Sequence, residues 1–160
     1  MTLYPIPGAN ELKIYTDSDR LNSSLIFFRI WVKHNAKGVV VTDKILVIET
    51  EENLRQRYQN ELQEEGYEVV TVADGREAFK KIMSEAVDLV ILELEYDGSG
   101  LEYLQRFMKA RRNLKVVIHT DYPNYKGNFH SWAADAFLVK SADLCELKKT
   151  IDTLLHAKRN

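Results

Sequence analysis

The stretch DLVILEL, Asp88 to Leu94, organises this sequence. Its residues Leu89 to Leu92 are apolar without interruption, which fits a strand that is buried on both faces. Such a strand is typical of the centre of a parallel sheet between two layers of helices. A single acid, Glu93, follows the apolar run. We expect it at the carboxyl end of the strand, where doubly wound domains place their ligand or reaction sites.

Strand and helix patterns alternate on both sides of this stretch. The expected strands are KILVIE from Lys44, YEVVTVA from Tyr67, DLVILEL, KVVIHT from Lys115 and AFLVK from Ala136. Segments with helical spacing of apolar residues follow them, although the one over Asn128 to Ala133 is weak. The alternation predicts an α/β, flavodoxin-like, doubly wound five-stranded parallel sheet of order 2-1-3-4-5, with helices on both faces.

Composition bounds the class of protein. The chain of 160 residues suits one domain that buries roughly two-thirds of its unfolded surface. A net charge of −2 with a pI near 6.1 argues against nucleic acid as a partner. The single cysteine, Cys145, excludes an internal disulfide framework and fits a reducing cytoplasm. The sequence has neither an apolar run of bilayer length nor a signal-peptide pattern, so we expect a soluble, cytoplasmic protein without a membrane partner.

Residues 1–43 differ from the rest of the chain. ELKIY and LIFFRIWV have the aromatic and β-branched content of short strands, which favours a β-rich N-terminal extension. The alternative is that the natural start lies near Val41 and that the preceding residues are upstream translation. Both interpretations stay open, and neither assigns a function to this segment. The domain that carries function is expected over residues 44–160.

Four polar residues mark the ends of predicted strands: Glu49, Glu93, Thr120 and Lys140. In a sheet of order 2-1-3-4-5 these strand ends open onto one crevice. Phosphoryl chemistry needs such a set, because one carboxylate accepts the phosphoryl group and another helps to hold Mg²⁺. The lysine and the hydroxyl then bind the equatorial oxygens.

The motifs KILVIETEEN, DLVILELE, VIHT and FLVK resemble the receiver domain of bacterial two-component response regulators, over Lys44 to about Ala157. WAADAFLVKSADLCEL is also similar to single-domain regulators that lack an output domain. The resemblance implies a catalytic set in which an acid receives phosphate from a kinase histidine, a Mg²⁺ site, and a conformational switch. Carried over to this sequence, these are Glu93, Thr120 and Lys140 for catalysis, Glu49 (with Thr50) and Glu93 for the metal, and Thr120 and Phe137 for the switch.

Several of these positions depart from the family pattern. Glu93 replaces the phosphate-accepting aspartate, and its extra methylene displaces the carboxylate in a reaction that is sensitive to about 1 Å. Thr50 replaces the second acid after the first strand, which removes a charge from a Mg²⁺ site that needs near-ideal geometry. Asp121 adds a negative charge where a phosphate needs room. The sequence therefore predicts a degenerate receiver with Mg²⁺ binding weakened and no other cofactor.

These observations favour a non-enzymatic signalling module that acts through protein–protein contacts without phosphorylation. The resemblance implies a histidine kinase or a downstream effector as partner, through the face of the fourth helix, strand five and the last helix. A homodimer stays open. One alternative is a phosphorylatable receiver that catalyses Mg²⁺-dependent transfer from a histidine kinase. Another is a nucleotide binder of the same topology, which the acidic TEEN after strand one disfavours.

Overall fold

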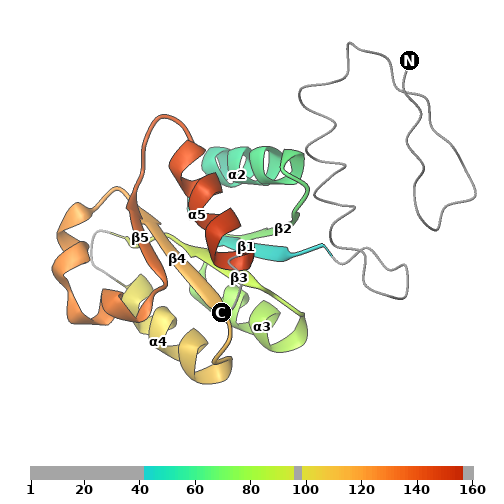
Figure 1. The fold of residues 1–160 in the computed structure, drawn as a ribbon. Helices are drawn as coiled ribbons and strands as arrows, with labels where there is room; N and C mark the ends of the chain where they lie inside the picture. The colour runs from blue at the N-terminus through green and yellow to red at the C-terminus, as the bar shows by residue number, and fades with distance from the viewer. Residues whose placement is uncertain (1–41, 96–98, 157–160) are drawn as a thin grey trace, which may run out of the picture. The chain divides into compact units, whose positions relative to one another are not determined.

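The computed structural model describes residues 42–95 and 99–156 (Figure 1). Most of the predicted N-terminal extension, 1–41, lies outside the described residues, as does 96–98 after the third strand. In chain order the elements are β1 (Lys44–Ile48), α2 (Glu52–Glu64), β2 (Glu68–Val72), α3 (Gly75–Ser84), β3 (Leu89–Leu92), α4 (Gly100–Ala110), β4 (Lys115–Thr120), the 3₁₀ helices η2 (Pro123–Gly127) and η3 (Phe129–Ala133), β5 (Ala136–Val139) and α5 (Cys145–His156).

The five strands form one parallel sheet of order β2-β1-β3-β4-β5, as the sequence predicts. The register pairs Ile48 of β1 with Leu92 of β3, so these two neighbouring strands end at the same level. All four residues of β3 are buried, which explains why its sequence is apolar throughout rather than alternating.

Helices cover both faces of the sheet, with α2 and α5 on one face and α3 and α4 on the other (Figure 1). The first pair buries Leu62 and Ile151 against strands β1, β3 and β4. The second pair buries Ile82 and Phe107 against the other face. Gly66, two residues after α2, has a φ of 87°, a left-handed conformation that ends a helix at low cost for glycine. Within the described residues, no helix is both long and apolar enough to cross a bilayer.

The weak helix expected over Asn128 to Ala133 is a 3₁₀ helix, and a second 3₁₀ helix precedes it. Two local features explain the difference. Pro123 begins the first 3₁₀ helix, and the Asn128 side chain accepts the backbone N–H of His130 at 2.9 Å, which caps the second one. The chain between β4 and β5 therefore forms two short 3₁₀ helices, which agrees with the weakness of the helical pattern there.

Gly100 allows the start of α4 to pack closely against the end of β3. A Cβ atom at this position would lie 2.8 Å from the carbonyl oxygen of Glu93 and 2.7 Å from Leu94 Cδ2. We expect Gly100→Ala to lower the free energy of unfolding by about 1–3 kcal/mol, because backbone must move to relieve the overlap. That cost exceeds the helix propensity that alanine adds, at most about 1 kcal/mol.

Urea unfolding monitored by circular dichroism measures this effect. Gly127→Ala is the matched control, because nothing lies within 4 Å of a Cβ atom there, and we expect it to stay within about 0.5 kcal/mol of the natural chain. Equal stability of the two variants would contradict the close seating of α4.

Candidate functional site

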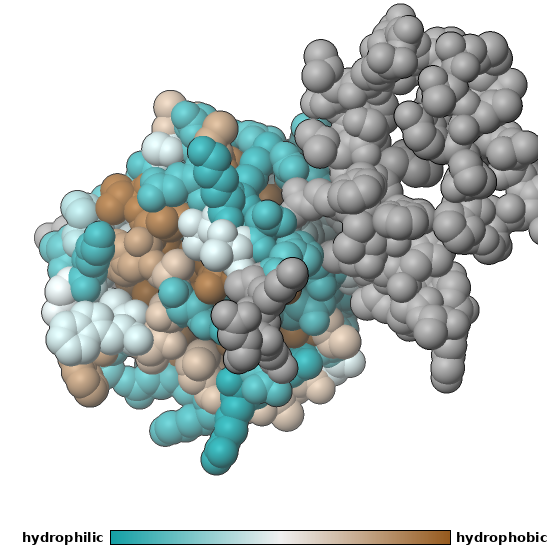
Figure 2. Space-filling view, viewed as in Figure 1, coloured by the Kyte–Doolittle hydropathy of each residue, from teal (hydrophilic) through white to brown (hydrophobic). Residues whose placement is uncertain are grey.

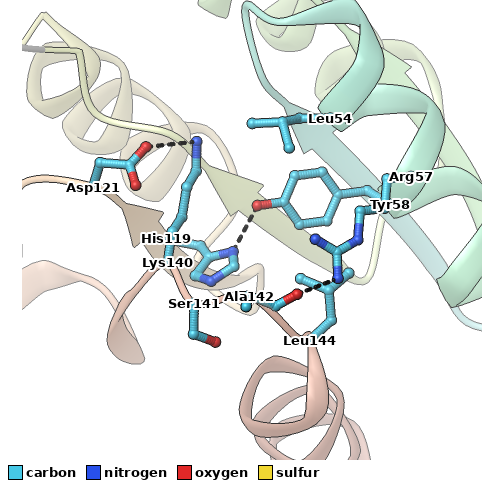
Figure 3. A pocket seen from close by; sticks show the side chains of 9 residues that line it. All are labelled: Leu54, Arg57, Tyr58, His119, Asp121, Lys140, Ser141, Ala142 and Leu144. Atoms are coloured by element: carbon cyan, nitrogen blue, oxygen red, sulfur yellow. Dashed lines mark hydrogen bonds and ion pairs between the residues drawn. The ribbon is translucent and has the colours of Figure 1, made fainter.

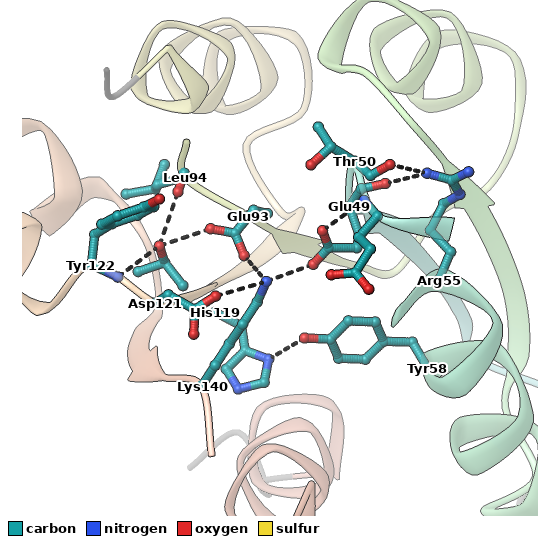
Figure 4. Close-up of polar contacts among 12 residues, drawn as sticks. Glu49, Thr50, Arg55, Tyr58, Glu93, Leu94, His119, Asp121, Tyr122 and Lys140 are labelled. Atoms are coloured by element: carbon teal, nitrogen blue, oxygen red, sulfur yellow. Dashed lines mark hydrogen bonds and ion pairs between the residues drawn. The ribbon is translucent and has the colours of Figure 1, made fainter. Parts of the chain in front are cut away.

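The four polar residues predicted at the strand ends lie together at the carboxyl edge of the sheet (Figure 4). They are Glu49 directly after β1, Glu93 directly after β3, Thr120 at the end of β4 and Lys140 directly after β5. Their strands are neighbours in the order β1-β3-β4-β5, and parallel strands end at one edge. The topology thus brings together residues that lie up to 91 positions apart in the chain.

The Lys140 ammonium lies at the centre of this cluster. Its Nζ is 2.7 Å from Glu49 Oε2, pairs with Glu93 Oε2, and is 3.5 Å from Asp121 Oδ2. The side chains of Glu49, Glu93 and Lys140 are 3%, 8% and 11% exposed, whereas that of Asp121 is 63% exposed. The site is therefore a buried ion-pair network with one solvent-facing carboxylate at its rim.

Thr120 fixes the other oxygen of Glu93. The fully buried Thr120 hydroxyl lies 2.8 Å from Glu93 Oε1 and 3.0 Å from the carbonyl oxygen of Leu94, so its single hydrogen serves two oxygens. The Tyr122 backbone N–H donates to the same hydroxyl at 3.2 Å. These contacts hold the Glu93 carboxylate between Thr120 and Lys140.

Burial and pairing act against each other on the charges of the site. Burial raises the pKa of Glu93 more than Lys140 and Thr120 lower it, so the net shift is upward. Burial alone would lower the pKa of Lys140, but the hydrogen bonds to Glu49 and Glu93 outweigh it and raise the pKa above the ordinary lysine value. Lys140 is therefore a charged ammonium at neutral pH.

Sequence reasoning missed a second buried contact, between Tyr58 of α2 and His119 of β4. The Tyr58 hydroxyl lies 2.7 Å from His119 Nδ1, and the rings meet edge to face at 5.7 Å. Burial, then the nearby Lys140 charge, lowers the pKa of His119 to about 4, so the imidazole is neutral at physiological pH. The sequence did contain a signal for this contact. Successive side chains of a strand point to opposite faces of the sheet, so His119 and Thr120 must face different helix layers.

The Tyr58–His119 pair lines a cavity of about 250 Å³ beside Lys140 (Figure 3). The cavity lies between α2, the ends of β4 and β5, and the start of α5. Arg57 closes one side by donating to the carbonyl oxygen of Ala142 at 2.8 Å. A second cavity of about 250 Å³ lies on the acidic side of the cluster, between Glu49, Glu93 and Tyr103.

The predicted switch residues occupy different environments. Thr120 is fully buried and belongs to the cluster, whereas Phe137 is half-buried and packs against the α3–α4 side of the core. Thr50 joins the site through its backbone, because its carbonyl oxygen accepts from Arg55 at 2.7 Å. The Thr50 side chain does not take the place of the missing acid in any contact with Lys140.

The predicted metal ligands, Glu49 and Glu93, do not form a free pair of carboxylates. Glu49 Oε1 accepts the backbone N–H of Glu51 at 3.0 Å, Glu93 Oε1 accepts the Thr120 hydroxyl, and Lys140 binds the remaining oxygen of each. Among residues 42–95 and 99–156, no three His, Cys, Asp or Glu side chains are grouped to hold a metal ion. Glu49 and Glu93 are the two carboxylates at this rim that could ligate a Mg²⁺ ion, which needs near-octahedral oxygen ligands, and both contact Lys140.

Comparison with known proteins places this geometry in a family. Residues 45–152 match the response regulator receiver domain. The response regulator protein TrrA from Thermotoga maritima, solved in complex with Mg²⁺–BeF, is 43% identical with a TM-score of 0.68. The match covers 71% of this chain and all of TrrA. TrrA has also been solved in complex with the histidine kinase ThkA, and that match has a TM-score of 0.67.

Two relatives differ in how much of their length is matched. Sporulation initiation phosphotransferase F from Bacillus subtilis is 27% identical over 124 residues, which cover 76% of this chain and the whole relative. The response regulator ArlR from Staphylococcus saprophyticus is 31% identical over 114 residues, which cover 70% of this chain and 52% of ArlR. This chain thus spans about half the length of relatives such as ArlR. The extent of the family match and the strand-end cluster together show that the chain belongs to the response regulator receiver domain family.

Proposed function

We propose that this receiver domain works in two-component phosphorelay signalling without being phosphorylated itself, through contacts with a protein partner. The observation that carries the proposal is the pairing of Lys140. An ammonium has three N–H donors and no acceptor, and three carboxylates, Glu49, Glu93 and Asp121, face this one. An oxygen of an incoming phosphoryl group would have to compete with the buried carboxylates of Glu49 and Glu93 for Lys140, and Asp121 adds a negative charge 3.5 Å away.

The identity of residue 93 supports the same proposal. Glu93 reaches Thr120 and Lys140, the partners that a phosphoryl group would use in the resemblance described above. Its carboxylate imitates part of a phosphorylated side chain, although it carries one charge where a phosphate carries nearly two. The domain is thereby held close to one conformational state. We assign this module to residues 44–160, in the cytoplasm, with no nucleic acid or membrane partner, and treat 1–43 as an extension.

The alternative function is Mg²⁺-dependent phosphotransfer to the domain itself. Its support is that Glu93, Thr120 and Lys140 still meet at one rim, and that TrrA binds Mg²⁺–BeF and a histidine kinase. We weigh this below the first proposal, because the carboxylate at position 93 is already paired and Thr50 supplies no second acid. Weakened Mg²⁺ binding is part of the first proposal, in which the domain is not phosphorylated.

Glu93→Asp tests whether the rest of the site is competent. Shortening the side chain by one methylene withdraws the carboxylate from Thr120 and Lys140 and frees both for a phosphoryl group. We expect this variant, incubated with a small-molecule phosphodonor and Mg²⁺, to gain the mass of one phosphoryl group in intact-protein mass spectrometry. Glu93→Gln is the matched control and should stay unchanged. An unchanged mass for Glu93→Asp would show that residues other than position 93 also block the reaction.

We propose that the partner binds the face of η3, β5 and α5. Phe129, Trp132 and Val139 are 75%, 69% and 42% exposed there, and the rings of Phe129 and Trp132 lie 5.8 Å apart. Figure 2 shows apolar side chains gathered near β5 and mostly hydrophilic ones over α2. Exposed aromatic residues of this kind are frequent anchors at protein interfaces.

Trp132→Ala is expected to weaken binding to a histidine kinase or effector partner at least about tenfold, because it removes an interface anchor. Its melting temperature should stay near that of the natural chain, since the indole is 69% exposed. Surface plasmon resonance with an immobilised candidate kinase measures the first quantity. Met83→Ala is the control, because Met83 is 62% exposed but lies on α3, away from this face. Equal binding by both variants would contradict the proposal that the partner binds the face of η3, β5 and α5.

A further inference from the structure

The cavity of about 250 Å³ beside the strand-end cluster takes no part in the proposed function. Its apolar walls are Leu54, the Tyr58 ring and Leu144 (Figure 3). Its polar lining includes His119 and Asp121. An apolar cavity of about 150 Å³ is large enough to hold a benzene molecule. This cavity therefore has room for a compound with one ring and a small polar group.

One ring nitrogen of His119 is without a partner in the part of the chain that the structure describes. The residue is 3% exposed, and its Nδ1 lies 2.7 Å from the Tyr58 hydroxyl. Within residues 42–95 and 99–156, Nε2 makes no hydrogen bond and is not enclosed by protein atoms, so it opens into the cavity that His119 lines. Nearly all buried polar side-chain atoms have a hydrogen-bond partner, so this nitrogen is a contact point for a ligand.

The Tyr58 hydroxyl makes His119 Nε2 a hydrogen-bond donor. Burial raises the pKa of Tyr58, so the hydroxyl keeps its proton. When this hydroxyl donates to Nδ1, the neutral imidazole carries its own hydrogen on Nε2. The other tautomer would leave the hydroxyl hydrogen without an acceptor among the described residues. The cavity therefore presents an N–H group to a ligand.

The charges around the cavity favour an uncharged ligand. Arg57 is paired with Glu61 at 2.8 Å, and three carboxylates share the single positive charge of Lys140. The outermost of these three, Asp121, has a side chain that is 63% exposed, so it repels an anion but accepts an N–H hydrogen. A primary amide has both groups that this lining can bind, because its carbonyl oxygen accepts from His119 and its N–H donates to Asp121.

We propose that this cavity binds a small uncharged amide with a one-ring apolar body, held by hydrogen bonds to His119 Nε2 and Asp121. The ring of the ligand lies against Leu54, Tyr58 and Leu144. The site joins α2 to the ends of β4 and β5 and to the start of α5, so a bound ligand favours the conformation in which these elements meet. The inference goes beyond the proposed function, because it stands whether or not the domain accepts a phosphoryl group.

A titration of benzamide into the ¹⁵N-labelled full chain, followed by NMR, tests the proposal. We expect saturable shifts of the His119 ring nitrogens and of the Tyr58 and Leu144 amides, with a dissociation constant on the order of 1 mM. Benzoate has the same ring but a negative charge, and it should bind at least about fivefold more weakly. The absence of saturable shifts at these residues, or equal affinity for benzoate, overturns the proposal.

Two variants assign the binding to this cavity. His119→Phe keeps a ring but removes the N–H donor, and we expect it to bind benzamide at least about tenfold more weakly. Asp121→Asn removes the repelling charge, so the ratio of the benzoate to the benzamide dissociation constant should fall at least about threefold. Glu64→Gln is the matched control, because Glu64 is an exposed carboxylate at the end of α2, and it should keep the ratio of the natural chain.

Unchanged benzamide binding by a folded His119→Phe variant overturns the proposal. An unchanged ratio in Asp121→Asn also overturns it, and this comparison decides the matter if His119→Phe does not fold, because Asp121 is an exposed side chain. Neither titration contains a phosphodonor, so their outcome is independent of whether the domain is phosphorylated.

Discussion

Lys140→Met is expected to lower the free energy of unfolding by about 3–5 kcal/mol, measured by urea unfolding at neutral pH. Removing one partner of a buried ion pair leaves the other charge in a low-dielectric environment without compensation. Here two carboxylates lose their counter-ion at once, with side chains 3% and 8% exposed. The expected loss is thus a large part of the total stability of a domain of this size.

The matched controls separate this charge effect from simple truncation. Lys109→Met removes an exposed lysine and should stay within about 0.5 kcal/mol of the natural chain. The double variant Lys140→Met, Glu93→Gln removes one uncompensated charge and should be more stable than Lys140→Met alone by at least about 1 kcal/mol. If Lys140→Met cost no more than Lys109→Met, the ion-pair network would not hold the strand ends together.

His119 is expected to make the stability of the domain fall as the pH drops from about 6.5 to about 4. The pKa of His119 is about 4 in the folded state, whereas an unfolded chain has the ordinary histidine value of about 6.5. Between these pH values the His119 imidazole is protonated in the unfolded state but not in the folded state, so acidification favours unfolding. A difference of this size corresponds to about 3 kcal/mol, fully lost only below pH 4.

The measurement is a series of urea unfolding curves over this pH range for the natural chain and for His119→Gln. Glutamine keeps a group that can accept from the Tyr58 hydroxyl but does not titrate. The raised pKa of Glu93 acts in the opposite direction, because its protonation favours the folded state as the pH falls towards the ordinary glutamate value. Glu93 is present in both proteins, so the difference in their pH dependence of stability is due to His119. Parallel curves would contradict a neutral, buried His119.

The sheet was predictable because parallel strands covered on both faces leave an unambiguous trace. Strands with one exposed face alternate apolar and polar residues, but the central residues of DLVILEL, KILVI and KVVIH are apolar in succession. The strand order of doubly wound sheets then brings the carboxyl ends of these strands together. That rule sufficed to predict that Glu49, Glu93, Thr120 and Lys140 share one rim. It is a statement about the backbone, so it holds whatever the side chains do.

The pairing within the rim was less predictable, because it depends on side-chain reach rather than on topology. The Glu93–Lys140 pair could be expected from the sequence, but the engagement of Glu49 and Asp121 by the same ammonium could not. The Tyr58–His119 contact joins residues 61 positions apart. From the sequence alone, Tyr58 looks like one of the apolar residues of α2, so its hydroxyl contact could not be predicted. The 3₁₀ helices between β4 and β5 follow from Pro123 and Asn128, whose local effects outweigh a weak helical pattern.

Intact-protein mass spectrometry of the natural chain, after incubation with a small-molecule phosphodonor and Mg²⁺, tests the central claim most directly. Glu93→Asp is incubated in parallel, and samples are kept cold and near neutral pH because acyl phosphates hydrolyse readily. We predict an unchanged mass for the natural chain, since the position-93 carboxylate already pairs with Thr120 and Lys140. A labile adduct with the mass of one phosphoryl group on the natural chain would contradict phosphorylation-independent signalling.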